Sequence, residues 1–180
     1  MLSYHDDGPL FYTDTLAALQ DHARDSDATL LPHHISYARG SCGINWDLFD
    51  PEVSPVVEIH SEHGGSETDY DTLLGLRHSV AGGSTINTAQ YALAQGIRFG
   101  FSGGSDDHWG CPGTHGEGLM GVWASANTRD AIFEGLRARH TVALTGDRIR
   151  LSVTLNDAPM GSALSATPTR LLSVAAEGWD

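Results

Sequence analysis

The sequence predicts an α/β fold with a parallel sheet or barrel, followed by a small antiparallel β segment. Strand-like and helix-like segments alternate up to about residue 146, which is typical of a sheet whose strands are joined by helices. Beyond Gly146, apolar and polar residues alternate with period two over residues 148–155, as in a strand with one exposed face. A length of 180 residues fits one domain of average size.

Three segments are predicted helices, because each follows a capping residue and repeats apolar residues at helical spacing. They run from a cap at Thr13 or Asp14 to about Ser26, from a cap at Ser84 to Gln95, and from a cap at Thr128 to about Arg139.

The predicted strands are short apolar runs, several of them rich in β-branched residues, which suits burial on both faces. They are residues 28–31, 55–59, 97–101, 120–124 and 141–145, then 148–155 with its partner 171–175. Between these strands, residues 60–84 and 102–118 are long polar segments rich in Gly, His and acids. In α/β folds the loops after the strands carry the chemistry.

The charge excludes several classes of partner. Asp and Glu number 23 against ten Arg and no Lys, which gives a net charge of −13. Such a chain has no electrostatic footprint for nucleic acid or anionic membranes. The absence of Lys also excludes a phosphate-binding P-loop. With no apolar run of membrane-spanning length and no signal-peptide pattern, a cytoplasmic location is expected, and export stays possible if the N-terminus is truncated.

Polar residues with metal-ligand chemistry follow three successive predicted strands. His33 and His34 come after the first. Glu58 lies near the end of the second and is followed by His60 and His63, and the third leads into Asp106, Asp107 and His108. Because the carboxyl ends of parallel strands meet at one edge, these side chains are expected to converge.

Imidazole and carboxylate groups are ligands that suit Zn, Mn or Fe. Asp106 and His108 alternate along an extended segment, so both can point to the same side, and a carboxylate can bridge two ions. The alternative is that residues 106–108 form an ordinary turn, since Asp favours turns. A serine nucleophile in residues 61–67 is a further alternative, but no Gly-x-Ser-x-Gly elbow follows any strand.

Residues 103–108, Gly-Gly-Ser-Asp-Asp-His, resemble the last metal motif of the PHP (polymerase and histidinol phosphatase) superfamily. Residues 30–34, Leu-Leu-Pro-His-His, are similar to an earlier motif of that superfamily. With residues 57–67 and 144–149, they look like a PHP-like bacterial family of unknown function. The resemblance implies a distorted (β/α)7 barrel, two or three divalent ions, and metal-dependent hydrolysis of a small phosphoester.

The resemblance also assigns roles to individual residues. The expected metal ligands are His33, His34, Asp106 and His108, with His5 as a further candidate. Glu58, His63 and Asp107 are expected to orient water or to act as a general base. Arg148 is a candidate for binding a substrate oxyanion, because Arg presents a planar fork to phosphate; a salt bridge to a neighbouring acid is the alternative.

One departure from the PHP pattern concerns the N-terminus, where no His-x-His precedes His33. Residues 1–146 are therefore expected to form the later part of a PHP-type barrel, and residues 147–180 the start of a C-terminal β segment. Two other functions stay open. The chain is a truncated remnant that binds metal weakly without catalysis, or it is an amidohydrolase-like enzyme that cleaves C–N bonds with the same ligands.

Overall fold

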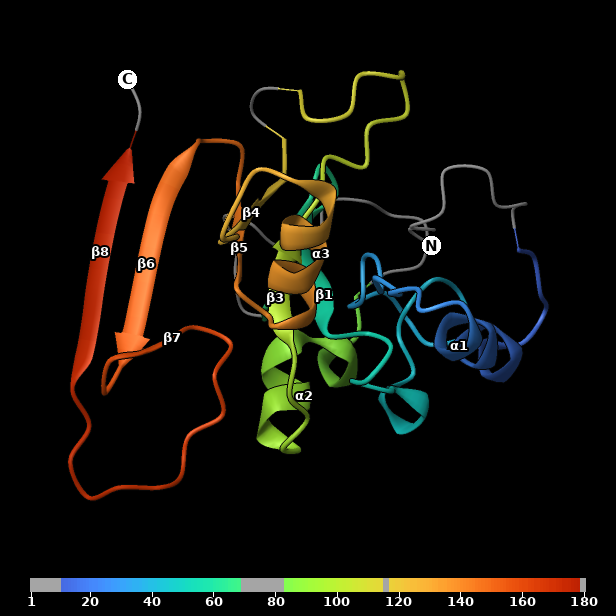
Figure 1. Cartoon of the computed structure of the whole chain (residues 1–180). Helices are drawn as coiled ribbons and strands as arrows, with labels where there is room; N and C mark the ends of the chain where they lie inside the picture. The colour runs from blue at the N-terminus through green and yellow to red at the C-terminus, as the bar shows by residue number, and fades with distance from the viewer. Residues whose placement is uncertain (1–10, 69–82, 115–116, 179–180) are drawn as a thin grey trace.

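The computed structural model describes residues 11–68, 83–114 and 117–178, arranged as small sheets flanked by short helices (Figure 1). The helices are α1 (Leu16–Asp25), α2 (Ala89–Ala94) and α3 (Arg129–Arg137), with 3-10 turns at Trp46–Leu48 and Thr85–Asn87. The strands are β1 (Val56–Ser61), β2 (Gly64–Gly65), β3 (Gly100–Gly103), β4 (Leu119–Val122), β5 (Thr141–Leu144), β6 (Ile149–Leu155), β7 (Ala158–Pro159) and β8 (Leu172–Gly178).

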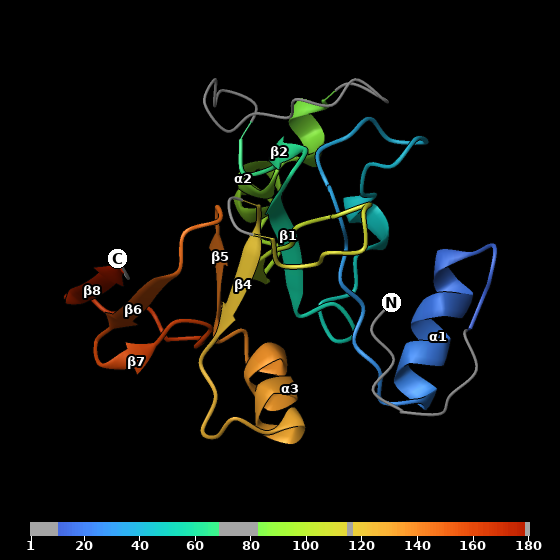
Figure 2. The same cartoon turned by 90° about the horizontal axis from the view of Figure 1, so that it is seen from above.

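These strands form three separate sheets. β1 lies between β2, which is antiparallel to it, and β3, which is parallel. β4 and β5 form an antiparallel pair that packs beside β3. β6 lies between β7 and β8, and both neighbours are antiparallel to it. Seen from above, β1, β4 and β5 occupy the middle of the molecule, between α1 and the β6–β8 hairpin (Figure 2).

The main core holds the β1–β3 pair in place. Val57 of β1 is fully buried and packs with Ile35, Trp46 and Phe99. The rings of Trp46 and Phe99 are stacked at 5.4 Å between centroids. A second cluster lies under α1, where Ala23 and Leu30 are buried. The two clusters fix the segment at residues 30–35 from both sides, and this segment carries His33 and His34.

The helices form where capping residues and apolar stripes predict them, but they are shorter. Thr128 caps α3 as predicted, because its side chain accepts a hydrogen bond from the N–H of Ala131. Thr15, not Thr13 or Asp14, caps α1. The second predicted helix is split: Thr88 is extended and caps α2, so the preceding residues form only a 3-10 turn.

The predicted (β/α)7 PHP-type barrel is wrong. Within the described residues, the strands form sheets of only two or three members, and the β1–β3 pair is the one parallel pair between named strands. The apolar run at residues 28–31 forms no extended strand; Leu30 donates a hydrogen bond to the carbonyl of Val53. β4 and β5 pair directly and antiparallel, so α3 between them does not connect two parallel strands.

The C-terminal β segment is a hairpin with a regular ladder. Seven successive residue pairs join β6 and β8, from Ile149 with Gly178 to Leu155 with Leu172. The turn after β6 uses Asn156 and Asp157, both with positive φ, as the Asn-Asp sequence predicts. In Figure 1 the hairpin stands on the opposite side of the molecule from α1. No helix of the described segments has the length and apolarity needed to cross a membrane.

Candidate metal centre

Predicted metal ligands and His63, which was predicted to orient water or act as a general base, converge on the carboxylate of Asp106, beyond the C-terminal ends of β1 and β3. Its Oδ1 lies 3.2 Å from Nε2 of His33. Its Oδ2 lies 2.8 Å from Nε2 of His63 and 3.6 Å from Nε2 of His34. Three imidazoles from two segments therefore surround one carboxylate, as the positions after the strands predict.

The side chains divide into two groups with the spacing of metal ligands, and each group offers ligand atoms within 4.8 Å of one another. One group is His33, His34 and Asp106. The other is Glu62, His63, Asp106 and His108. Because Asp106 belongs to both groups, its carboxylate can bridge two ions, which is the arrangement of two-metal hydrolytic centres.

The chemistry of Asp106 fits a cation. Its Oδ2 is buried and accepts no hydrogen bond from any residue that the structure describes, although Nε2 of His63 lies 2.8 Å away. A buried carboxylate oxygen without a donor is costly unless a positive charge compensates it. The donor set of imidazole nitrogens and carboxylate oxygens suits Zn, Mn or Fe.

Glu58, in β1, orients two groups of the neighbouring segment that carries His33 and His34. Its Oε1 lies 2.7 Å from Nδ1 of His33 and accepts a hydrogen bond of 3.0 Å from the backbone N–H of His34. A carboxylate on Nδ1 directs Nε2 of His33 toward Asp106 and makes the ring a better ligand. Glu58 thus positions His33, a member of the first ligand group, and is not itself a member of either group.

The backbone is strained where the centre is formed. Asp106 has φ +53° and His34 has φ +31°, both in the left-handed region that side chains other than Gly rarely adopt. Close backbone packing supports this conformation. A Cβ added at Gly118 would lie 2.3 Å from the carbonyl oxygen of Gly104 and 2.9 Å from that of His60. Strain of this kind is concentrated at functional sites.

The histidines differ in their protonation. Burial lowers the pKa of His33, but the hydrogen bond to Glu58 and the charges of Glu58 and Asp106 outweigh it, so the pKa is raised overall. Burial lowers the pKa of His34, and the neighbouring His33 lowers it further. The hydrogen bond to Glu62 raises the pKa of His108, and the charge of Asp106 adds to this effect. His34 is therefore more easily available as a neutral ligand than His33 or His108.

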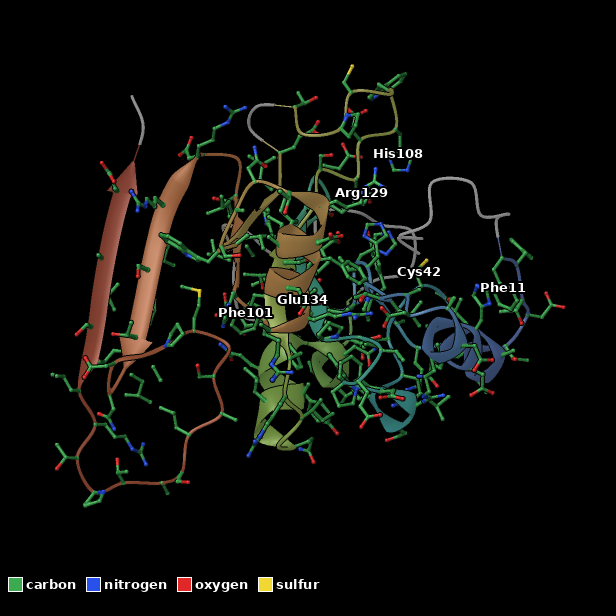
Figure 3. All side chains as sticks on the ribbon, in the orientation of Figure 1. Phe11, Cys42, Phe101, His108, Arg129 and Glu134 are labelled. Carbon is green, nitrogen blue, oxygen red and sulfur yellow. The ribbon has the colours of Figure 1, made fainter. Side chains whose placement is uncertain are left out.

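A surface cavity of about 540 Å³ opens onto the second group of ligands. It is lined by His34, Tyr37, Cys42, Glu62, His63, His108 and Trp109. In Figure 3, Cys42 lies between α1 and the loop that carries His108. The ligands are thus reachable from solvent, as a catalytic centre requires.

The other predicted site residues lie in different surroundings. Oδ1 of Asp107 accepts hydrogen bonds of 2.8 Å from the backbone N–H groups of Trp109 and Cys111, so this carboxylate holds the turn of the loop. Arg148 is exposed in the turn between β5 and β6 and belongs to neither ligand group. His5 lies outside the described residues.

The sequence pattern did not single out two acids of this region. Glu62 joins His63, Asp106 and His108, and its only sequence signal is its place between the His residues that follow β1. Burial raises the pKa of Glu117, and the charges of Asp107 and Glu62 raise it further. Oε2 of Glu117 is buried without a hydrogen bond in the described part of the chain. This carboxyl group can therefore hold a proton more readily than an ordinary Glu.

Comparison with known proteins gives relatives without an assigned activity. Residues 106–157 match the model of DUF3604, a protein family of unknown function. The chain is 36% identical over 134 residues to an uncharacterized protein of Chlamydia pneumoniae and 35% identical over 133 residues to one of Chlamydia trachomatis. Each match covers 68% of this chain and 21% of the relative, so the chain spans about a fifth of the length of these relatives. No solved structure matches it.

These matches correct the family expected from the sequence. The family model that matches is DUF3604 and not one of the PHP superfamily, so the PHP resemblance is not supported. The short metal-type motifs after the strands suggested that superfamily, but such motifs recur wherever His and Asp converge on an ion. The match begins at Asp106, the residue on which both ligand groups depend.

Proposed function

We propose that the chain carries the centre of a metal-dependent hydrolase that acts on a small phosphoester with two divalent ions of Zn, Mn or Fe. The observation that supports this most is the shared carboxylate of Asp106, which belongs to two ligand groups at once. Its buried Oδ2 without a hydrogen bond is the second support.

Two ions bound there would supply an activated water and offset the charge that develops on the transferred group. The chain's own residues determine how such ions are held. His33 and His34 offer nitrogens in one ligand group with Asp106, and Glu62, His63 and His108 offer ligand atoms in the other. Glu58 keeps the ring of His33 in the orientation that directs Nε2 toward Asp106.

The surrounding residues also fit a reaction that needs proton transfer. Burial and the charges of Asp107 and Glu62 raise the pKa of Glu117, so this carboxyl group keeps a proton more readily than an ordinary Glu. The cavity lined by His63, His108 and Trp109 gives a small substrate access to the ligands. With only ten Arg and no Lys in the chain, the bound ions would provide much of the positive charge that a phosphoester needs.

The experiment compares Asp106→Ala with Asp107→Ala. Each protein is stripped with a chelator and reloaded with Mn²⁺ or Zn²⁺. Metal content is then measured by mass spectrometry, and hydrolysis with p-nitrophenyl phosphate. We expect Asp106→Ala to lose bound metal and hydrolysis together, because both groups lose their common member.

Asp107→Ala is the matched control and should keep its metal, since Oδ1 of Asp107 accepts hydrogen bonds from backbone N–H groups. Equal metal content in Asp106→Ala and the wild-type protein would sink the proposal.

A further inference from the structure

A second cavity, which is lined in part by His33, has a different character. It has a volume of about 440 Å³ and lies between α1 and the segments at residues 30–33 and 42–50. Most of its lining side chains are apolar, including Leu16, Leu19, Ile44, Leu48 and Phe49. This volume falls within the range of sites for small molecules.

Two side chains lie both in the lining of this cavity and beside the candidate metal centre. His33 lines it, and Nε2 of the same side chain lies 3.2 Å from Asp106. Cys42 lines both this cavity and the cavity over Glu62, His63 and His108. The apolar lining therefore begins at a side chain that also contacts Asp106.

The walls of the cavity are held together by specific contacts. The side-chain amide of Gln20 on α1 donates a hydrogen bond of 2.8 Å to the carbonyl of Leu48. Asp50, the one carboxylate in the lining, forms an ion pair with Arg24 of α1. Its charge is thus compensated, and the lining includes no Arg. The cavity is suited to an uncharged group and not to a second phosphate.

We propose that this cavity binds the apolar substituent of the substrate, so that the enzyme acts on phosphoesters of aromatic or long-chain alcohols. The inference rests on the proposed hydrolase function, because the phosphoryl group has to be held at Asp106. The cavity then selects the substrate by the apolar area that it removes from water. Small polar phosphoesters bind through the metal centre alone.

The test uses two non-hydrolysable ligands, 1-naphthylphosphonate and methylphosphonate, with the Mn²⁺-loaded protein and calorimetry. Burying about 100 Å² of the naphthyl group at roughly 25 cal/mol per Å² predicts binding at least about tenfold tighter than that of methylphosphonate. Leu48→Glu places a carboxylate in the lining and should remove most of this difference while bound Mn²⁺ stays unchanged. Leu16→Glu, in another wall, should act in the same way.

The matched control is Leu164→Glu. Leu164 is 46% exposed and lies outside the cavity, whereas Leu48 is 55% exposed within its lining. This control should keep the full preference for the naphthyl ligand. Both substitutions replace an exposed Leu, so a general loss of stability would affect them alike.

Three results would overturn the proposed substrate selection. They differ in whether they also contradict the proposed hydrolase function. Equal affinity for the two phosphonates in Mn²⁺-loaded protein contradicts the apolar site and leaves the metal centre intact. Naphthyl binding that is unchanged in Asp106→Ala shows a cavity unconnected with the centre. Failure to bind Mn²⁺ or Zn²⁺ removes the proposed hydrolase function and the substrate selection with it.

Discussion

The metal centre and the β6–β8 hairpin are formed by opposite means. The hairpin is held by one continuous antiparallel ladder between residues 149–155 and 172–178, and every residue of β8 is exposed. The centre has almost no regular ladder. Its side chains come from residues 33–34, 58–63 and 106–108, which loops and core packing bring together. The hairpin is thus regular although β8 is exposed. The centre instead depends on contacts between residues that lie far apart in the sequence.

Substitution of one glycine in each region should have very different effects on stability. Gly118→Ala places a methyl group against the carbonyl oxygens of Gly104 and His60, both backbone atoms that cannot move without disturbing the loop of Asp106. We expect a loss of about 3 kcal/mol in the free energy of unfolding. Gly178→Ala, at the end of β8, meets no atom within 4 Å and should change stability by less than about 0.5 kcal/mol.

Chemical denaturation of the metal-free proteins measures both values. If the two substitutions cost the same, the close packing around residue 118 is not what holds the loop. A loss of metal in Gly118→Ala is expected as well, because the loop carries Asp106.

The same contrast explains how far the sequence predicted the structure. Period-two alternation located β6, and the Asn-Asp pair located its turn, because both signals act over a few residues. The capping Thr128 located α3 for the same reason. The barrel failed because apolar runs show that a segment is buried and not which segment it pairs with. The run at residues 28–31 is an example, since in the described part of the chain Leu30 bonds to Val53 and the run belongs to none of the three sheets.

The candidate centre was predictable in part. His33, His34, Asp106 and His108 follow predicted strands, and the structure brings all four into the two ligand groups. Glu62 was missed, because its partner His108 lies 46 positions away and no local pattern links them. The sequence separated Asp106 from Asp107 by assuming an extended segment, whereas Asp106 is left-handed at φ +53° and its carboxylate still lies 2.8 Å from His63.

The second prediction concerns the strain at Asp106. Asp106→Gly removes the bridging carboxylate and also relieves the left-handed conformation at φ +53°. In chelator, we expect the metal-free variant to be about 1 kcal/mol more stable than the wild-type protein, because the left-handed conformation no longer costs free energy. It should nevertheless bind no metal at the shared position.

Thermal unfolding with and without Mn²⁺ separates these effects. The wild-type protein should gain stability from Mn²⁺, and Asp106→Gly should gain none. The exposed Asp157, also left-handed at φ +65° but in the hairpin turn, is the control: Asp157→Gly should leave the stabilisation by Mn²⁺ unchanged. If Asp106→Gly were less stable than the wild-type protein in chelator, the conformation would not be strained.

The smallest expected effect is a difference between two adjacent histidines. Glu58 and Asp106 raise the pKa of His33 despite its burial, whereas burial and His33 itself lower the pKa of His34. NMR titration of the metal-free protein should therefore give a midpoint above about 6.5 for His33 and below it for His34. The stabilisation from protonated His33 is complete below its unfolded pKa of about 6.5 and is lost as the pH rises through the higher folded value.

Glu58→Gln tests whether the charge of Glu58 raises the pKa of His33. The amide keeps an oxygen near Nδ1 of His33 but removes the negative charge, so the midpoint of His33 should fall while the fold is retained. The second expected consequence is weaker metal binding, because the ring loses the carboxylate that makes it a better ligand. An unchanged midpoint would mean that Asp106, 3.2 Å from Nε2, is sufficient to hold the proton on His33. Glu58 would then serve only to fix the backbone at His34.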